Sequence, residues 1–275
     1  MTNFSSLRDL PEPSVAPHLY TEALKHARYN RYSNILPLDA TRVKIDTKGT
    51  LLETSYINAN YVDVGFRDFI VSQAPISEDI SAFWYMVFTN DIKSIFMLTS
   101  LKEGEKVKAT RYWPSRGTIE FPRVGITIVP MKVDTLTPDV YITELLLIRG
   151  TTMKRVTHYH YVGWPDFGVP RTYHSFERML TKANRSADVL VHCSAGCGRA
   201  GVFCSVYRAL ITGETIKTAV EAVRRCRQGA VQTSSQYRFA STIVDRVRSL
   251  SRPPTPPRPL CTTRRSTPIR VSGSE

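Results

Sequence analysis

The segment from residue 188 to residue 212 constrains the fold of this 275-residue chain more than any other. Its first five residues, DVLVH, form a short apolar run that is typical of a strand buried on both faces of a sheet. A loop rich in small residues follows and ends at Gly201. Apolar residues then recur at helical spacing, at Val202, Phe203, Val206 and Leu210. The sequence therefore predicts a buried strand, a glycine-containing loop and a helix in direct succession.

The other expected elements divide unevenly along the chain. Short runs of β-branched and aromatic residues predict strands at 68–72, 94–99, 124–129, 140–148 and 154–162. Apolar residues at a 3.6-residue period predict helices at 80–88, 215–228 and 234–249. The run Ser77-Glu-Asp79 is expected to cap the first of these helices, and Gly229 ends the second. Because strands precede most helices, we expect an α/β or α+β fold with a mixed sheet.

Composition predicts one folded domain between two extensions. Residues 19–250 are expected to form a single domain, which is long enough to bury a sizeable core. Residues 1–18 are polar and interrupted by proline, and we expect them to form an N-terminal arm. Residues 251–275 hold six of the 17 prolines and five arginines, so this tail is expected to be extended or disordered.

Charge and cysteine content restrict the classes of binding partner and the cellular compartment that we expect. The formal net charge of +13 fits nucleic acid, an anionic membrane or a phosphorylated substrate as the partner. The five cysteines are odd in number and lack the spacing of a disulfide framework, so we expect reduced thiols and a cytoplasmic location. No apolar run reaches the roughly 18 residues of a membrane helix, and we expect no transmembrane segment and no signal peptide.

The loop after the buried strand has the composition of an anion-binding site. Successive N–H groups of such a loop can turn inward, and the dipole of the following helix adds to their positive field. The loop residues expected to line the anion site are Ser194, Ala195, Gly196, Cys197 and Gly198. Arg199 is expected to grip two oxygens of a tetrahedral oxyanion in a bidentate fork. The same field favours the thiolate of Cys193, which would then be a nucleophile aimed at phosphorus.

Two further motifs supply the remaining chemistry of a phosphoryl transfer. Asp166, in the run Trp164-Pro-Asp166, is expected to protonate the leaving oxygen from a short segment that swings as a lid. Gln232 and Gln236 lie where a loop enters a helix, and either amide would orient a water toward a cysteinyl-phosphate. The same residues also fit a simple helix cap with amides facing solvent.

An ordered series of motifs resembles the tyrosine-specific protein-tyrosine phosphatases over about residues 20–250. The matching runs are NRYSNILP (30–37), YINANY (56–61), FIVSQAP (69–75), KATRYWP (108–114), WPD (164–166), HCSAGCGR (192–199) and QTSSQ (232–236). The resemblance implies a highly twisted mixed sheet flanked by helices, with the phosphate loop between a central strand and a helix. It also implies hydrolysis of phosphotyrosine in proteins, without metal or other cofactor.

The resemblance also implies the role of each catalytic residue. Cys193 would be the nucleophile, Arg199 the phosphate clamp and Asp166 the general acid and later the base. Gln232 would position the hydrolytic water, with assistance from Gln236.

The residues that would bind the substrate follow from the same comparison. Tyr32 and Phe167 would form the two walls of a slot for the phenyl ring, and aromatic walls suit such a ring. Asn34 would bind the substrate backbone. Lys108 would reach Asp166. The supporting residues would be Glu103, which orients Arg199, together with His192 and Trp164.

Several positions depart from the family pattern. Ala200 stands where Ser or Thr is usual, and we expect slower breakdown of the phospho-enzyme. Cys197 replaces a bulky aliphatic residue and is either a small packing residue or a partner for oxidised Cys193. The basic residues Arg224, Arg225 and Arg227 are expected to border the mouth of the site.

Alternatives to a phosphotyrosine phosphatase stay open at this point. The first is a pseudophosphatase that binds phosphotyrosine without turnover, which Ala200 keeps possible. The second is a phosphatase of RNA 5′ ends or of phosphoinositides, which fits the positive charge, although no specific nucleic-acid partner is expected. The run Pro253-x-x-Pro256-x-Arg258, within residues 252–259, also fits a polyproline segment that an SH3 domain binds.

Overall fold

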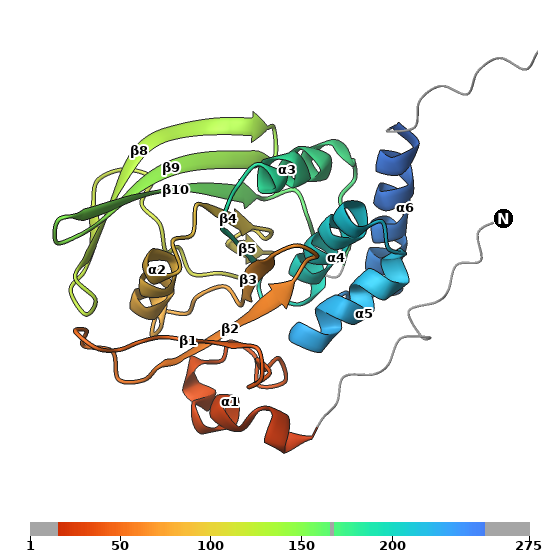
Figure 1. Cartoon of the computed structure of the whole chain (residues 1–275). Helices are drawn as coiled ribbons and strands as arrows, with labels where there is room; N and C mark the ends of the chain where they lie inside the picture. Colours follow the sequence, from red (N-terminus) through yellow and green to blue (C-terminus); the bar gives the residue numbers. More distant parts are fainter. Residues whose placement is uncertain (1–15, 166–167, 251–275) are drawn as a thin grey trace, which may run out of the picture.

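The computed structural model of the chain describes residues 16–165 and 168–250, and these contain a large mixed β-sheet with helices on both faces (Figure 1). The strands of this sheet are β1 (Arg42–Lys44), β2 (Tyr56–Asp63), β3 (Asp68–Ser72), β4 (Ser94–Met97), β7 (Ile119–Phe121), β8 (Ile126–Thr137), β9 (Val140–Arg149), β10 (Thr152–Tyr161) and β11 (Val189–His192). A separate short hairpin pairs β5 (Lys102–Glu103) with β6 (Lys106–Val107).

The longer helices lie on the two faces of the sheet, and the short N-terminal ones belong to a separate small core. The helical elements are η2 (Pro17–Leu19), α1 (Thr21–Lys25), η3 (Ala27–Tyr29), α2 (Ile80–Thr89), α3 (His174–Asn184), α4 (Gly198–Thr212), α5 (Ile216–Cys226) and α6 (Ser234–Leu250). One core packs α3 to α6 against one face of the sheet, and a second core packs α2 against the other face. The expectation of a twisted mixed sheet flanked by helices is confirmed.

The strand order places β11 in the interior of the sheet, beside β4. The order is β1-β2-β3-β11-β4-β10-β9-β8-β7. β11 pairs in parallel with both β3 and β4, and β4 also pairs in parallel with β10, whereas the remaining pairs of the sheet are antiparallel. In β11, Val189 and Val191 enter one core and Leu190 the other, as the alternation of a pleated strand requires. The loop after β11 therefore leaves the sheet between two parallel neighbours, where ligand sites of α/β proteins occur.

Most expected elements are confirmed, with shifts at their ends. The strand expected at 94–99 ends at Met97, and the strand expected at 124–129 begins at Ile126 and continues to Thr137. Several elements were not expected from the sequence. The longer ones are β2 and α3, and the short ones are β1, β5, β6, β7, η2, α1 and η3. β2 was missed because two buried asparagines interrupt its apolar run. α3 was missed although its sequence does carry a helical stripe of apolar residues, namely Phe176, Met179, Leu180 and Ala183.

The expected cap of α2 is wrong in one respect. Asp79 is the N-cap residue, but its side chain makes no capping hydrogen bond to the helix. Its carboxylate turns back and accepts hydrogen bonds from the Ile76 amide at 2.8 Å and from Gln73 Nε2 at 3.3 Å. Burial raises the pKa of the Asp79 carboxyl to about 7, against the opposing effect of these hydrogen bonds and of Arg31.

This buried acid makes folding dependent on pH. Between about pH 4 and about pH 7, folded Asp79 holds a proton that the unfolded chain releases, so stability falls as pH rises through this window. Asp79→Asn removes the ionisation. We expect its stability relative to the wild type to rise between about pH 4 and about pH 8, by up to about 4 kcal/mol. Urea unfolding at both pH values measures the change.

The exposed neighbour Glu78 offers a matched control. Because its charge is the smallest of the contributions to the raised pKa of Asp79, Glu78→Gln should alter the pH dependence of stability far less than Asp79→Asn. An Asp79→Asn variant whose stability difference from the wild type is equal at both pH values would contradict the assignment.

Candidate active site

Cys193 lies at the bottom of a cavity at the end of β11. The cavity has a volume of about 510 Å³, and the Cys193 side chain is almost completely buried beneath it. The Sγ atom accepts a hydrogen bond from the Gly196 amide at 3.3 Å. The helix α4 begins at Gly198, so the positive end of its dipole faces the same loop.

Every carbonyl oxygen from residue 193 to residue 196 is held by a group outside the loop. Cys193 O lies 3.0 Å from Nδ1 of His192, and Ser194 O accepts from the Ala74 amide at 2.9 Å. Arg227 donates to Ala195 O at 3.0 Å and to Gly196 O at 3.1 Å. In a trans peptide the C=O and the next N–H point in opposite directions, so carbonyls held outward turn the following amides inward. The loop is therefore a preformed cradle of N–H donors.

Two glycines allow this tight conformation. Gly196 has a φ of +75°, and a Cβ atom at that position would lie 2.2 Å from the Ser72 carbonyl oxygen. A Cβ atom on Gly198 would lie 2.5 Å from Oε1 of Gln232. Side chains at these two positions would push the loop away from Ser72 at the end of β3 and away from Gln232.

Arg227 corrects one expectation from the sequence. Instead of bordering the mouth of the site, its guanidinium lies below the loop, 1% exposed, and also donates to Asn60 Oδ1 at 2.8 Å. Burial lowers the pKa of the Arg227 guanidinium from its usual value. Arg224 is also turned away and donates to the carbonyls of Ala230 and Val231. Spacing alone placed these residues near the site, but it gave no direction to their side chains.

Two hydrogen bonds donated by one nitrogen of the Arg199 guanidinium hold this side chain in place. Its Nη1 donates to Glu103 Oε1 at 2.5 Å and to the Trp164 carbonyl at 2.7 Å, while the residue is only 2% exposed. Thr99 Oγ1 in turn donates to Glu103 Oε1 at 3.3 Å. The structure thus brings together Arg199, Glu103 and Trp164, three residues that the sequence placed in separate motifs.

One wall of the cavity is tied directly to the loop. Ser194 Oγ donates to the Lys108 carbonyl at 2.7 Å, so the hydroxyl of Tyr32 donates to Ser194 Oγ at 2.8 Å. The expected residues that line the cavity are Tyr32, Asn34, Lys108, Cys193, Ser194, Ala195, Arg199, Gln232 and Gln236. Ile35, Lys106 and Val107 line it too and were missed, although each lies within two residues of an expected contact. Gly196, Cys197 and Gly198 are buried in the loop behind this lining.

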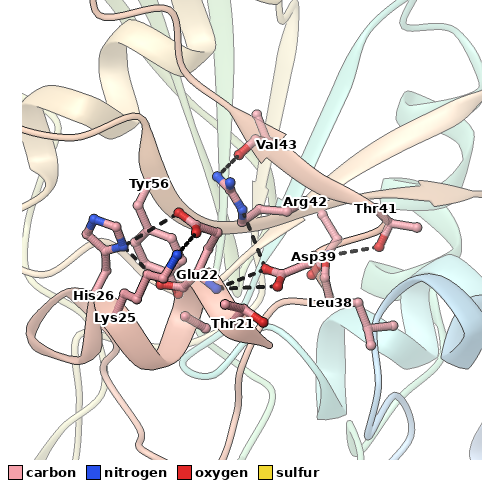
Figure 2. Close-up of polar contacts among 12 residues, drawn as sticks. Thr21, Glu22, Lys25, His26, Leu38, Asp39, Thr41, Arg42, Val43 and Tyr56 are labelled. Atoms are coloured by element: carbon pink, nitrogen blue, oxygen red, sulfur yellow. Dashed lines mark hydrogen bonds and ion pairs between the residues drawn. The ribbon is translucent and has the colours of Figure 1, made fainter. Parts of the chain in front are cut away.

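The segment that carries Tyr32 rests on an N-terminal layer. Asn30 Oδ1 accepts from Tyr56 at 2.5 Å and from Asn58 at 2.8 Å. The other end of this segment is held by Asp39. Its Oδ1 accepts a hydrogen bond from the Glu22 backbone N–H and lies 3.9 Å from Nε of Arg42 (Figure 2). Because these contacts lie on both sides of residues 30–38, they fix the wall of the cavity relative to β2.

The two glutamines stand at the start of α6. The backbone N–H of Gln232 donates to the side-chain Oε1 of Gln236 at 2.9 Å. The backbone N–H of Gln236 donates to Thr233 Oγ1 at 3.2 Å. Val231 precedes them with a φ of +60°, which is costly for a β-branched residue. Its amide donates to Cys197 O at 3.2 Å, which joins the glutamine segment to the phosphate loop.

Asp166 and Phe167 lie outside the described residues. On either side of them, Trp164 is fully buried and its Nε1 donates to the Gly168 carbonyl at 3.0 Å. Within residues 16–165 and 168–250, no cluster of three or more His, Cys, Asp or Glu side chains is arranged to hold a metal ion. In the same residues, no helix combines the length and apolarity needed to cross a bilayer.

Comparisons with known proteins agree with this geometry. The family model described as protein-tyrosine phosphatase matches residues 26–246. Human tyrosine-protein phosphatase non-receptor type 2 is 32% identical over 240 residues, which cover 82% of this chain and 57% of the relative. Tyrosine-protein phosphatase 3 of Schizosaccharomyces pombe is 38% identical over 207 residues, or 70% of this chain and 67% of the relative. The chain thus spans little more than half the length of the human relative.

Solved structures show the same similarity. The Trypanosoma cruzi protein tyrosine phosphatase TcPTP1 has a TM-score of 0.75 and 32% identity, covering 83% of this chain and 85% of that one. The catalytic domain of human protein tyrosine phosphatase non-receptor type 18 has a TM-score of 0.73 and 30% identity, covering 81% and 85%.

The role of Arg227 in holding the loop can be tested with inorganic phosphate. Arg227→Met keeps the apolar stem but leaves the Ala195 and Gly196 carbonyls without their donor. We expect phosphate affinity to fall at least about tenfold and stability to fall by about 3 kcal/mol. Isothermal titration and urea unfolding measure the two effects.

Arg224→Met is the matched control, since it removes a guanidinium three residues earlier, in the last turn of α5, without touching the carbonyls of residues 193–196. Its phosphate affinity should stay within about twofold of the wild type. Wild-type phosphate affinity in Arg227→Met would contradict the assignment.

Proposed function

Because this chain belongs to the protein-tyrosine phosphatase family, we propose that it hydrolyses phosphotyrosine in proteins through a cysteinyl-phosphate intermediate. The observation that carries the proposal is the position of the Cys193 thiol, below a cavity and inside a loop whose amides turn inward. A nucleophile in a cradle of N–H donors suits attack on a tetrahedral dianion.

The first step transfers the phosphoryl group to the enzyme. The Cys193 thiolate attacks phosphorus, a P–S bond forms, and the bond from phosphorus to the aryl oxygen breaks. The loop amides and Arg199 bind the equatorial oxygens, where charge is concentrated in the transition state. Asp166 donates a proton to the departing aryl oxide, which otherwise leaves slowly.

The second step returns the enzyme to its starting state. A water attacks phosphorus, the P–S bond breaks, and Asp166 takes a proton from that water. The amide of Gln232 positions the water, with assistance from Gln236, and both side chains line the cavity beside Cys193. Inorganic phosphate then leaves from the cradle, and no step calls for a metal ion or another cofactor.

Selectivity for phosphotyrosine comes from the depth and walls of the cavity. Tyr32 forms one wall, Phe167 is proposed to face it, and Asn34 binds the backbone of the substrate. Lys108 is proposed to reach Asp166 from the same cavity. A phosphoserine side chain is too short to bring its phosphate to Cys193 while its backbone stays at the rim.

A reducing compartment follows from the proposed nucleophile. Four cysteines are described, at positions 193, 197, 204 and 226, and all four are free thiols. Because the reaction needs a reduced Cys193, we propose that the protein acts in the cytoplasm. An SH3-domain partner at residues 252–259 stays a prediction, because that segment lies outside the described residues.

Turnover of a phosphotyrosine peptide tests the proposed activity. We expect phosphate release from this peptide, and release from a phosphoserine peptide, 5′-triphosphate RNA and a phosphoinositide at least about a hundredfold slower in kcat/KM. Cys193→Ser should abolish turnover and still bind the peptide. Binding without turnover by the wild type, or activity confined to the other phosphates, would contradict the proposal.

Ala200 generates a separate kinetic prediction. Ala200 is completely buried at the start of α4 and carries no hydroxyl to assist departure of the Cys193 thiolate. We expect a burst of leaving group followed by slow steady-state turnover. Ala200→Ser should abolish the burst and raise kcat about three- to tenfold, as stopped-flow measurements would show. Ala200→Gly is the matched control, and equal rates of both phases in the wild type would contradict the prediction.

A further inference from the structure

A chain of three buried side chains runs from strand β10 to the carbonyl group of Cys193. His158, Tyr112 and His192 are each at most 1% exposed. The Tyr112 hydroxyl oxygen lies 2.7 Å from Nε2 of His158 and 2.6 Å from Nε2 of His192. His192 Nδ1 in turn lies 3.0 Å from the Cys193 carbonyl oxygen. These contacts allow only certain positions for the shared protons.

The number of protons in this chain is fixed by burial. Burial lowers the pKa of His192 to about 3 and lowers that of His158 well below its usual value, so both rings are neutral at working pH. Burial also raises the pKa of Tyr112 well above its usual value, so its hydroxyl keeps its proton. Each ring therefore has one N–H, and Tyr112 has one O–H.

The direction of each hydrogen bond follows from the Cys193 carbonyl. A carbonyl oxygen only accepts, so His192 must hold its proton on Nδ1 and present a lone pair on Nε2. Tyr112 must then donate to His192 Nε2. With its only proton used, the Tyr112 oxygen must accept from Nε2–H of His158.

We propose that His158 is a positioning residue that locks the tautomer of His192 and thereby aims the Ser194 amide into the phosphate cradle. When His158 Nε2–H donates to the Tyr112 oxygen, the Tyr112 O–H must donate to His192 Nε2. His192 then keeps its proton on Nδ1, which faces Cys193 O. The Cys193 carbonyl stays turned out of the loop, and the Ser194 N–H of the same peptide unit stays turned in.

The opposite arrangement of protons leaves two unfavourable contacts. It would put the His158 proton on Nδ1, which is buried and has no hydrogen-bond partner among the described residues, so a donor rather than a lone pair would be left unsatisfied. It would also place the bare lone pair of His192 Nδ1 against the lone pairs of Cys193 O. Both contacts are costly in a buried site. Removing the His158 ring removes the first cost and allows Tyr112 to accept rather than donate, so only the second cost still favours the Nδ1–H tautomer of His192.

The surroundings of His158 hold it in this orientation. Its ring stacks on Trp113, with ring centroids 4.3 Å apart. The guanidinium of Arg111 also lies over the Trp113 ring, 5.1 Å from its centroid. The titratable and charged groups that face His158 are His160, His192, Arg111 and Tyr112. The positive charge of Arg111 adds to burial in keeping His158 neutral.

His160 supplies a matched control on the same face of β10, two residues further on. It is also largely buried, and burial lowers its pKa to about 4. Its Nε2 bonds to the Thr99 carbonyl at 3.0 Å and not to Tyr112. Loss of His160 therefore perturbs the core near His158 without removing the donor to Tyr112.

The test is the tautomeric state of the histidines, measured by ¹⁵N NMR of the histidine-labelled 275-residue chain. In the wild type we expect a proton on Nδ1 of His192 and on Nε2 of His158. His158→Ala should give a mixture of His192 tautomers, and His158→Gln should restore the wild-type state, because its amide donates from a similar position. His160→Ala should keep the wild-type state of His192.

A second readout connects the tautomer to the nucleophile. The proposal rests on the proposed function for its kinetic consequence. We expect His158→Ala to slow alkylation of Cys193 by iodoacetate and to lower kcat about three- to tenfold, with KM within about twofold, and His158→Gln to restore both. Absence of phosphotyrosine turnover in the wild type would defeat the function but leave the spectra as a test of the lock.

Two results would overturn the proposal. One is a wild-type spectrum with the His158 proton on Nδ1, which needs no variant and so stands even if His158→Ala does not fold. The other is a folded His158→Ala protein in which His192 keeps a single Nδ1–H tautomer and Cys193 reacts with iodoacetate at the wild-type rate.

Discussion

The outward anchoring of the loop carbonyls is the constraint on which the rest of the site depends. Four consecutive carbonyl groups, from Cys193 to Gly196, bond to His192, to the Ala74 amide and to Arg227. An unanchored carbonyl could rotate into the loop and replace an N–H donor with an acceptor facing an anion. The anchors come from the end of β3, the end of β11 and the residue after α5, so the cradle exists only when these elements are packed together.

The electrostatics of the site rest on buried arginines and neutral histidines. Arg199 and Arg227 are almost fully buried, and Glu103 lies beside Arg199. His192 touches the Cys193 carbonyl but stays neutral because burial lowers its pKa to about 3. Its contribution is therefore a fixed dipole rather than a charge, and the positive field comes from the loop amides, the helix α4 and the arginines. The +13 net charge that first suggested several anionic partners contains four units from the tail 251–275 alone.

Local patterns in the sequence predicted the strand 68–72, the helix after the phosphate loop and the loop itself, each from a run of a few residues. Tyr32, Asn34 and Lys108 were expected in the cavity only from the resemblance to the phosphatase family, because Tyr32 meets Ser194 across 162 positions of sequence. Arg227 was misplaced because its partners, Ala195 and Asn60, lie far away in the sequence. The chain from His158 through Tyr112 to His192 joins residues 46 and 80 positions apart, and only the packed sheet brings them together. The side chain of Asp79 turns away from its helix for a different reason, because the nearby Gln73 side chain and Ile76 amide donate to it.

The inward direction of the loop amides is tested most directly by NMR during a titration with vanadate, an oxyanion that resembles phosphate. Amide signals of Ser194, Ala195, Gly196, Cys197 and Gly198 should shift together to lower field and saturate at one stoichiometric equivalent, because each amide gains a charged acceptor. The Arg199 side-chain signal should follow the same curve. Saturation of the Arg199 signal with no change at the five loop amides would contradict a preformed cradle.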